Sequence, residues 1–277
     1  MNLNGIVESI ERASTIKPEP GDYTENGLLH CGKCNTPKQT QIELFGKVRK
    51  PLCLCRCATE KRDAEQAAWE RQQQLDKVKR LRRMGFPDAE MSRWTFAVDD
   101  GENGKISTVA KNYVDNFAEM RKRGKGLLFF GDVGRGKSFI AACIANALID
   151  RGFPCLVTNF ARLTNTIGGM YSGKQEYIDG LDEFELLVID DLASERDTEY
   201  MGEMVQNIID SRYRSGKPLI ITTNLTAEEL KAPEDMRRQR IFSRLLEMCV
   251  PIEVQGYDRR KKKLVEEHRE MADLLGL

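Results

Sequence analysis

From residue 126 onward, short apolar runs alternate with longer segments in which apolar residues recur every three or four positions. The runs predict buried strands and the longer segments predict helices. The predicted strands are 126–130, 155–158, 186–190, 219–223 and 250–254. The predicted helices are 139–148, 160–171, 199–215, 235–248 and 259–275. This alternation is typical of an α/β fold in which helices flank a parallel five-stranded sheet and ligands bind at the carboxyl edge of the strands.

The chain before residue 126 has a different pattern. Residues 3–13 and 106–123 carry apolar residues at helical spacing, so each predicts an amphipathic helix. Residues 58–84 are almost entirely polar and contain neither glycine nor proline, which predicts a long, solvated helix. Gly85 and Pro87 end it. We therefore expect a small amino-terminal helical domain over residues 1–84 and a larger domain over residues 85–277.

Composition narrows the class of protein. The chain has 277 residues, of which 40% are hydrophobic and 31% charged, as in a globular protein with a sizeable core. Lys plus Arg and Asp plus Glu balance at 43 each, so contact with nucleic acid would depend on local patches. The sequence has neither an apolar run long enough to span a membrane nor the layout of a signal peptide, which predicts a cytoplasmic protein.

Residues 131–138 match the G-x-x-x-x-G-K-[ST] pattern of a phosphate-binding P-loop. A predicted strand precedes this loop and a predicted helix follows it, and this context disfavours a chance match. The glycines let backbone N–H groups face a polyphosphate, and the helix N-terminus adds positive charge. Lys137 is expected to reach the β- and γ-phosphates of ATP, and Ser138 to bind Mg²⁺. The predicted nucleotide-binding residues are Gly131, Asp132, Val133, Gly134, Arg135, Gly136, Lys137 and Ser138.

Two further strands end in polar side chains. The run 186–189 leads into Asp190 and Asp191. Asp190 is expected to hold Mg²⁺ opposite Ser138, and Asp191 to orient or deprotonate the attacking water. The run 219–223 leads into Asn224, which is placed to bond the γ-phosphate or that water. The alternative for both runs is that they are ordinary strands that end in polar residues without a role in catalysis.

Five of the eight cysteines crowd into one stretch. A Cys-x-x-Cys pair and a Cys-x-Cys-x-Cys run can supply four thiolates to one tetrahedral Zn²⁺, and the expected compartment disfavours disulfides. We favour Cys31, Cys34, Cys55 and Cys57 as ligands in a zinc module over about residues 28–60. Cys53 is the alternative fourth ligand, and His30, beside the first pair, could substitute for a cysteine. A redox role or an incidental cluster is the competing hypothesis.

Several arginines lie in the predicted helix 235–248. Those three or four positions apart share a face of the helix. Planar cations there can stabilise a γ-phosphoryl transition state or bind a nucleic-acid backbone, and a solvated basic surface is the alternative. The residues are Arg237, Arg238, Arg240 and Arg244.

Together these motifs resemble the Walker A, Walker B and sensor 1 elements of AAA+ ATPases. Over residues 90 to 265 the chain resembles, more narrowly, the DnaC/DnaI-type replicative helicase loaders and their phage versions. The stretches that carry this likeness are 126–138, 157–160, 187–192 and 240–245. The resemblance implies an ATPase that assembles into homo-oligomers, contacts single-stranded DNA and binds a hexameric replicative helicase.

The resemblance also implies roles for two arginines. Arg244, with Arg240 as a rival, would reach the ATP of a neighbouring subunit, and Arg260, with Arg259 as a rival, would be the sensor 2 residue. Asp191 stands where many AAA+ proteins have Glu, which predicts slower hydrolysis, and Arg135 stands where a smaller residue is commoner. The alternatives are an IstB-type transposition helper ATPase and a zinc-dependent adaptor with a structural nucleotide. The cysteine module resembles that of DnaI-type loaders, and it favours the loader.

Overall fold

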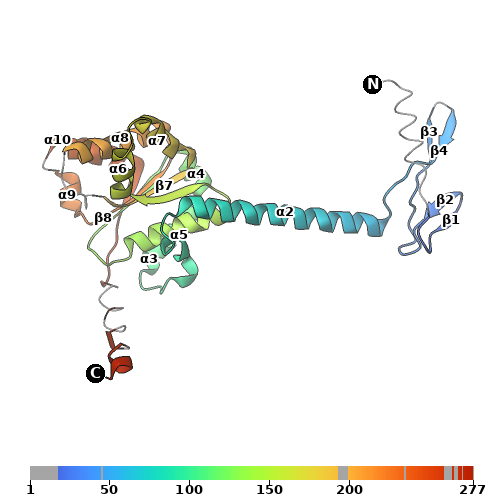
Figure 1. The fold of residues 1–277 in the computed structure, drawn as a ribbon, viewed down its shortest axis with the longest axis horizontal. Helices are drawn as coiled ribbons and strands as arrows, with labels where there is room; N and C mark the ends of the chain where they lie inside the picture. The colour runs from blue at the N-terminus through green and yellow to red at the C-terminus, as the bar shows by residue number, and fades with distance from the viewer. Residues whose placement is uncertain are drawn as a thin grey trace. The chain divides into compact units, whose positions relative to one another are not determined.

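The computed structural model describes residues 18–44, 46–192, 199–233, 235–258, 264, 268–269 and 271–276 (Figure 1). The chain divides into two compact units, residues 1–75 and 76–277. The division falls inside helix α2 (Arg56–Gly85), earlier in the chain than the predicted boundary after residue 84. The predicted helix over residues 3–13 lies outside the described residues.

The first unit contains two small antiparallel hairpins. Strands β1 (Tyr23–Glu25) and β2 (Leu28–His30) form one of them, and β3 (Ile42–Leu44) and β4 (Lys47–Arg49) form the other. Between β1 and β2, Asn26 and Gly27 both have positive φ, at 52° and 72°. This backbone suits a two-residue hairpin turn, for which Asn-Gly is the favoured pair. The Cys31–Cys34 loop follows directly after β2.

The second unit is built on a five-stranded parallel sheet with the order β6-β7-β8-β5-β9, so the predicted fold class is confirmed. The strand bounds are β5 Gly126–Phe130, β6 Cys155–Asn159, β7 Leu186–Leu192, β8 Leu219–Thr223 and β9 Cys249–Glu253. Strand β8 is the central strand, and β5 lies between β8 and the edge strand β9. Because all strands are parallel, their carboxyl ends share one edge of the sheet.

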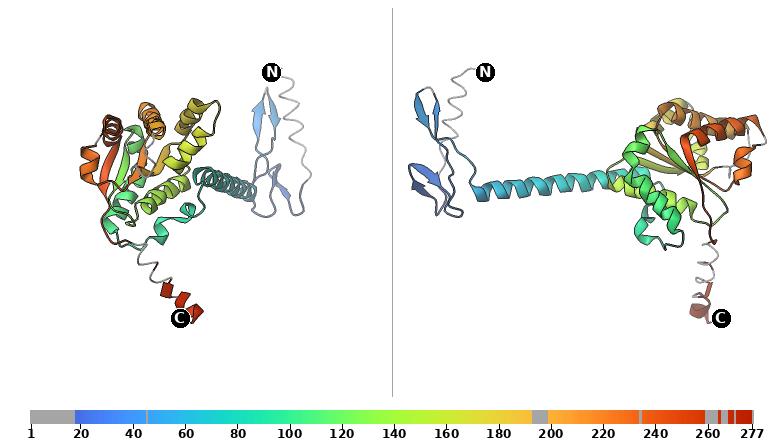
Figure 2. Two further views of the ribbon diagram at one scale, coloured as in Figure 1. Left: turned by 60° about the vertical axis from the view of Figure 1, so that its left-hand side comes forward. Right: turned by 180° about the vertical axis from the view of Figure 1, so that it is seen from behind.

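Helices cover both faces of this sheet (Figures 1 and 2). One face carries α3 (Gly104–Asp115) and α5 (Lys137–Asp150). The other face carries α6 (Phe160–Gly168), α8 (Glu199–Ser215) and α10 (Met236–Met248). Successive strand residues point to opposite faces, so Phe129 packs with the first group and Leu128 with the second. The strands are apolar throughout because both faces are buried.

Shorter elements complete this unit. They are α4 (Phe117–Lys122), α7 (Lys174–Gly180), α9 (Ala227–Lys231) and the 3₁₀ turns Met91–Arg93, Phe96–Val98 and Leu181–Glu183. The predicted helix 106–123 is divided at Asn116, whose side chain donates to the Asn112 carbonyl at 2.9 Å. The predicted helix 160–171 ends earlier, at Gly168. Of the predicted helix 259–275, the described residues 264, 268–269 and 271–275 are helical.

The carboxyl-terminal part of α2 belongs to the core of the second unit. Leu81 is only 7% exposed, Phe86 is equally buried, and Val78 packs beside them. Gly85 lies so close to β6 that an added Cβ would sit 2.3 Å from the Cys155 carbonyl oxygen. Within the described part of the chain, none of the helices combines the length and the apolar character needed to cross a membrane.

Candidate functional site

The loop between β5 and α5 has the backbone of a phosphate cradle. Gly131, Gly134 and Gly136 have φ values of 126°, 80° and 87°, a left-handed range that side chains disfavour. At Gly134 an added Cβ would also lie 1.9 Å from the Asp258 carboxylate. Helix α5 begins at Lys137, so its free N–H groups face the loop. The geometry suits a polyphosphate.

Lys137 is the buried lysine of the P-loop motif and is 7% exposed. Its Nζ donates to the carbonyl oxygens of Gly131 at 2.8 Å and Asp132 at 2.7 Å. A third bond, of 2.7 Å, goes to Oδ1 of Asn224. Burial lowers the pKa of Lys137, while the charges of Asp191 and Asp190 act in the opposite direction. The ammonium is therefore held between the P-loop and the ends of two strands.

The remaining P-loop side chains differ in exposure. Ser138 is half-buried in the first turn of α5, whereas Asp132 and Val133 are exposed. The guanidinium of Arg135 pairs with Asp132, and its carbonyl oxygen accepts a bond of 3.1 Å from Asn103. Arg135, the unusual residue of this motif, thus makes its ion pair within the loop.

Strands β7 and β8 bring the predicted acids and amide together. Oδ1 of Asp190 accepts a bond of 2.5 Å from the Thr222 hydroxyl, and Asp190 also lines a cleft of about 400 Å³. Oδ1 of Asp191 accepts a bond of 3.0 Å from the Asn224 amide. The same Asn224 contacts Lys137. Lys137, Asn224, Asp191, Thr222 and Asp190 consequently form one connected network at the carboxyl edge of the sheet.

The predicted finger arginines lie on α10, which leads directly into β9. Because β9 runs parallel to its neighbours, the end of α10 lies at the opposite edge of the sheet from the P-loop. Arg244, in the last turns of this helix, pairs with Asp210 on α8 and stacks 5.8 Å over the Tyr213 ring. Arg240, one turn earlier, is exposed. Arg259 and Arg260 lie outside the described residues.

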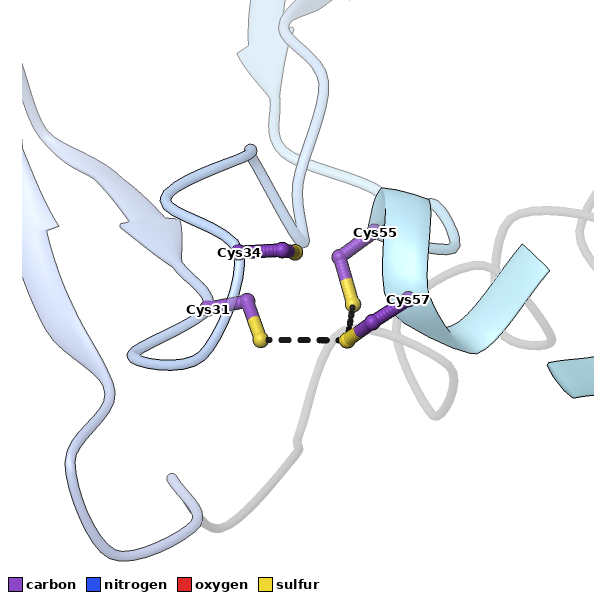
Figure 3. Close-up of side chains that lie close together, drawn as sticks. All are labelled: Cys31, Cys34, Cys55 and Cys57. Atoms are coloured by element: carbon purple, nitrogen blue, oxygen red, sulfur yellow. Dashed lines mark hydrogen bonds between the residues drawn. The ribbon is translucent and has the colours of Figure 1, made fainter. Parts of the chain in front are cut away.

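The sulfur atoms of four cysteines in the first unit form one cluster (Figure 3). The Sγ atoms of Cys31, Cys34, Cys55 and Cys57 all lie within 4.8 Å of one another. Cys57 Sγ is 3.6 Å from that of Cys31 and 3.4 Å from that of Cys55. Ligands about 2.3 Å from a tetrahedral Zn²⁺ would be roughly 3.8 Å apart, so the spacing fits the metal.

Cys53, the alternative ligand, is directed elsewhere: its thiol donates to the Pro37 carbonyl at 3.5 Å. His30, beside the first cysteine pair, stacks on Tyr23 with ring centroids 5.4 Å apart. Neither residue joins the group of four that could hold a metal ion among the described residues.

The pKa values of two of the thiols are shifted in opposite directions. The hydrogen bond with the Thr36 hydroxyl is the main reason that the pKa of Cys34 falls to about 5. Hydrogen bonds with Cys55, Cys34 and Cys31 raise the pKa of Cys57 to about 12. Four thiolates this close repel one another unless a cation lies between them. The donor set therefore matches a metal that ionises its thiol ligands.

Other residues that support these sites have no motif. Asp22 accepts a bond of 3.1 Å from the backbone N–H of Gly32 in the first cysteine loop, and Lys38 pairs with Asp22 at 2.7 Å. In the nucleotide site, Asn103 and Thr222 hold the P-loop and Asp190. Of these residues, only Thr222 had a signal in the sequence, because its strand leads into Asn224.

The sheet order, the P-loop and the acid-ended strand define the class: this is a nucleotide-binding protein of the AAA+ ATPase fold. The model of the IstB-like ATP binding protein family matches residues 62–267, which is more than half of the chain. The chain belongs to this family.

Curated relatives are named as helicase loaders. Replicative helicase loader DnaI of Bacillus subtilis (strain 168) is 24% identical over 161 residues, which cover 54% of this chain and 51% of that protein. Replicative helicase loader DnaC of Buchnera aphidicola subsp. Schizaphis graminum is 26% identical over 53% of this chain and 58% of that protein. The chain thus matches about half the length of these relatives.

Among solved structures, the crystal structure of DnaI is similar with a TM-score of 0.54 and 25% identity. The match covers 65% of this chain and 99% of the DnaI chain. The resemblance to DnaC/DnaI-type proteins that the motifs indicated is confirmed.

Proposed function

We propose that this protein is an ATP-dependent loader that binds a replicative DNA helicase and helps to place it on single-stranded DNA during replication. The observation that carries this proposal is that its curated relatives DnaI and DnaC are both named replicative helicase loaders. The similarity to the DnaI structure agrees with it. The ATPase would reside in residues 76–277, and binding of the hexameric helicase in residues 1–75.

The network at the sheet edge supports ATP hydrolysis. Lys137 would leave its carbonyl partners for the β- and γ-phosphates, and the P-loop N–H groups would hold the same phosphates. Ser138 and Asp190 would hold Mg²⁺, which neutralises phosphate charge when bound. Asp191 would accept a proton from the attacking water, and Asn224 would orient that water or the γ-phosphate.

Two arginines complete the proposed site. Arg244 would act on the nucleotide of a neighbouring copy, because α10 directs it away from the P-loop of its own chain, and Arg240 is the rival for this role. Arg260, or its neighbour Arg259, would contact the phosphates as the sensor 2 residue. The proposal therefore includes a homo-oligomer that forms when nucleotide is bound, and single-stranded DNA as a further partner.

The four cysteines would hold one Zn²⁺, and the fit of their spacing to a tetrahedral ion supports this. Zinc bound by four thiolates contributes to folding and leaves no open position for catalysis. In the first unit the ordered strands are only three residues long, and a structural metal would offset the small core. The metal would thus maintain the surface that contacts the helicase.

A helicase pull-down tests the loader. Tagged full-length chain, incubated with ATP and lysate of the source cell, is expected to recover a hexameric replicative helicase. A variant with both Cys31→Ser and Cys34→Ser should lose the helicase while still binding ATP. Recovery of a transposase and no helicase would instead favour the IstB-type transposition helper, the second candidate, for which the family match is the supporting observation.

Fragments separate the roles of the two units. The ATPase fragment should begin at Asp76 and not at residue 85, because Leu81 packs into the ATPase core. We expect residues 1–75 to bind helicase without ATP and residues 76–277 to bind ATP without helicase. If residues 76–277 bound the helicase and residues 1–75 did not, this result would contradict the proposed division of roles.

A further inference from the structure

The end of strand β7 is irregular where the two acidic residues lie. Strands β7 and β8 pair regularly up to Ile189 and Ile221, and pairing resumes at Leu192 and Thr223. Asp190 and Asp191 therefore stand opposite a single residue of β8, Thr222. This is the arrangement of a β-bulge, which re-aims side chains and leaves backbone groups without their ladder partners. Asp191 has φ 62°, a left-handed conformation that is uncommon outside glycine.

The hydroxyl of Thr222 fills the gap in the ladder. Its Oγ1 accepts a bond of 2.9 Å from the backbone N–H of Asp191. It donates its only proton to Oδ1 of Asp190, at 2.5 Å. Thr222 is 1% exposed, so water cannot replace either bond without rearrangement. One hydroxyl thus fixes the side chain of the first acid and the backbone of the second.

We propose that Thr222 is a positioning residue that aligns Asp190 for Mg²⁺ and Asp191 for the attacking water. The role rests on the proposed ATP hydrolysis. Thr222 holds one carboxylate oxygen of Asp190. The orientation of the second oxygen is then fixed, so that it can bind a cation. Fixing the Asp191 backbone directs its carboxylate to Asn224, 3.0 Å away, and through Asn224 to Lys137. Both alignments are lost together when the hydroxyl is removed.

The adjacent residue, Thr223, offers a matched control. It is fully buried, and its hydroxyl also makes two hydrogen bonds, to the Leu192 carbonyl at 2.8 Å and from the Leu225 N–H at 3.2 Å. Neither bond involves a carboxylate. Replacing either threonine by valine removes one buried hydroxyl from β8, so both changes should lower the melting temperature. Only the change at Thr222 should alter the orientation of the Asp190 and Asp191 carboxylates.

The experiment compares the full-length parent with Thr222→Val, Thr222→Ser and Thr223→Val. For each protein we would measure ATP turnover against ATP and Mg²⁺ concentration, binding of a fluorescent ATP analogue at each Mg²⁺ concentration, and thermal unfolding. Hydrogen bonds to charged groups are worth enough for about a tenfold to hundredfold effect. Thr222→Val should therefore lower kcat and raise the half-saturating Mg²⁺ concentration by roughly this factor, with little change in Mg²⁺-free analogue affinity.

The serine variant should restore kcat and Mg²⁺ dependence to within about threefold of the parent, because it keeps the hydroxyl. Parental Mg²⁺ dependence in Thr222→Val, or an equal defect in Thr223→Val, would overturn the proposal. If Thr222→Val does not fold, Thr222→Ala gives the same comparison. A parent chain that binds the analogue but hydrolyses no ATP would contradict the hydrolysis itself, and the Mg²⁺ titration of analogue binding would still decide the role of Thr222.

Discussion

Lys137 donates a hydrogen bond of 2.7 Å to the side-chain oxygen of Asn224, and so joins the P-loop to the end of strand β8. The amide nitrogen of Asn224 in turn donates to Asp191. Phosphate oxygens carry charge and compete for an ammonium more strongly than neutral carbonyl oxygens do. Entry of ATP is therefore expected to draw Lys137 away from Asn224 and to free the side-chain oxygen of Asn224 to accept a hydrogen bond from the attacking water.

The first prediction is that Lys137→Ala abolishes ATP binding. The variant removes the buried cation that would neutralise the β- and γ-phosphates, so titration with a fluorescent ATP analogue should show at least a hundredfold loss of affinity, about 3 kcal/mol. Lys105, an exposed lysine on α3, provides the control: Lys105→Ala should bind ATP like the parent. Equal affinity of Lys137→Ala and the parent would refute the proposed role of the P-loop.

The second prediction separates binding from hydrolysis. Asp191→Asn should keep ATP affinity within a few-fold but lower kcat by about 10² to 10⁴, the usual contribution of a general base. An asparagine at this position retains an oxygen that can accept from Asn224, so the network should persist while the base is lost. Steady-state phosphate release and analogue binding are the measurements.

Glu253 serves as the control for Asp191. It is an exposed acid at the carboxyl end of β9, on the same sheet edge, and Glu253→Gln removes one carboxylate charge from that edge. Turnover by Glu253→Gln should match the parent. Hydrolysis by Asp191→Asn at the parental rate would assign the base to another residue.

The sheet could be predicted from the sequence because each of its strands is buried on both faces. Continuous apolar runs such as 186–189 and 219–221 are typical of parallel strands that are covered on both faces, and the helix predicted over 199–215 coincides with α8. The hairpins of the first unit were missed because strands of three residues are too short to show alternation. The Asn26-Gly27 pair was the available signal.

The candidate site was predictable only where chemistry follows a fixed spacing. The P-loop, Asp190, Asp191 and Asn224 are named by motifs, and strand order brings them to one edge. The bond between Thr222 and Asp190 depends on a bulge, which no periodicity reveals. The pairing of Arg244 with Asp210 likewise depends on how α10 packs against α8, a tertiary contact between distant parts of the chain.

The third prediction concerns Arg244 and requires two copies of the chain. Arg244→Ala and Lys137→Ala should each lack ATPase activity, yet a mixture of the two should recover part of it. In the mixture an intact P-loop of one copy can meet an intact Arg244 of another, and a trans-acting arginine contributes about 10³-fold or more to the rate. Phosphate release at concentrations where the parent self-associates is the measurement.

Two further variants sharpen this test. Arg240→Ala mixed with Lys137→Ala examines the rival arginine in the same way. Arg123, an exposed arginine at the end of α4 that pairs with Glu119, provides a control, since Arg123→Ala alone should keep full activity. The absence of recovery in the Arg244→Ala mixture, with recovery in the Arg240→Ala mixture, would transfer the role to Arg240.

The last prediction is that the purified chain contains about one zinc ion, bound by Cys31, Cys34, Cys55 and Cys57. Metal analysis by mass spectrometry should give this ratio. Cys53→Ser should keep the zinc because the Cys53 thiol contacts the Pro37 carbonyl and not the cluster. Cys34→Ser should lose it because one of the four sulfurs is removed.

Removal of the metal should have a local effect. Binding free energy in small zinc modules is on the order of 10 kcal/mol and is also folding free energy, so a chelator should unfold residues 18–57. Hydrogen exchange should then rise at Cys31, whose N–H bonds the Thr36 carbonyl at 2.9 Å. Exchange in β5 should not change, because that strand lies in the other unit. Binding needs ionised thiols, so zinc should also be released as the pH falls. Unchanged exchange at Cys31 in metal-free protein would mean that the Asp22–Lys38 pair and the hairpins suffice to fold the module.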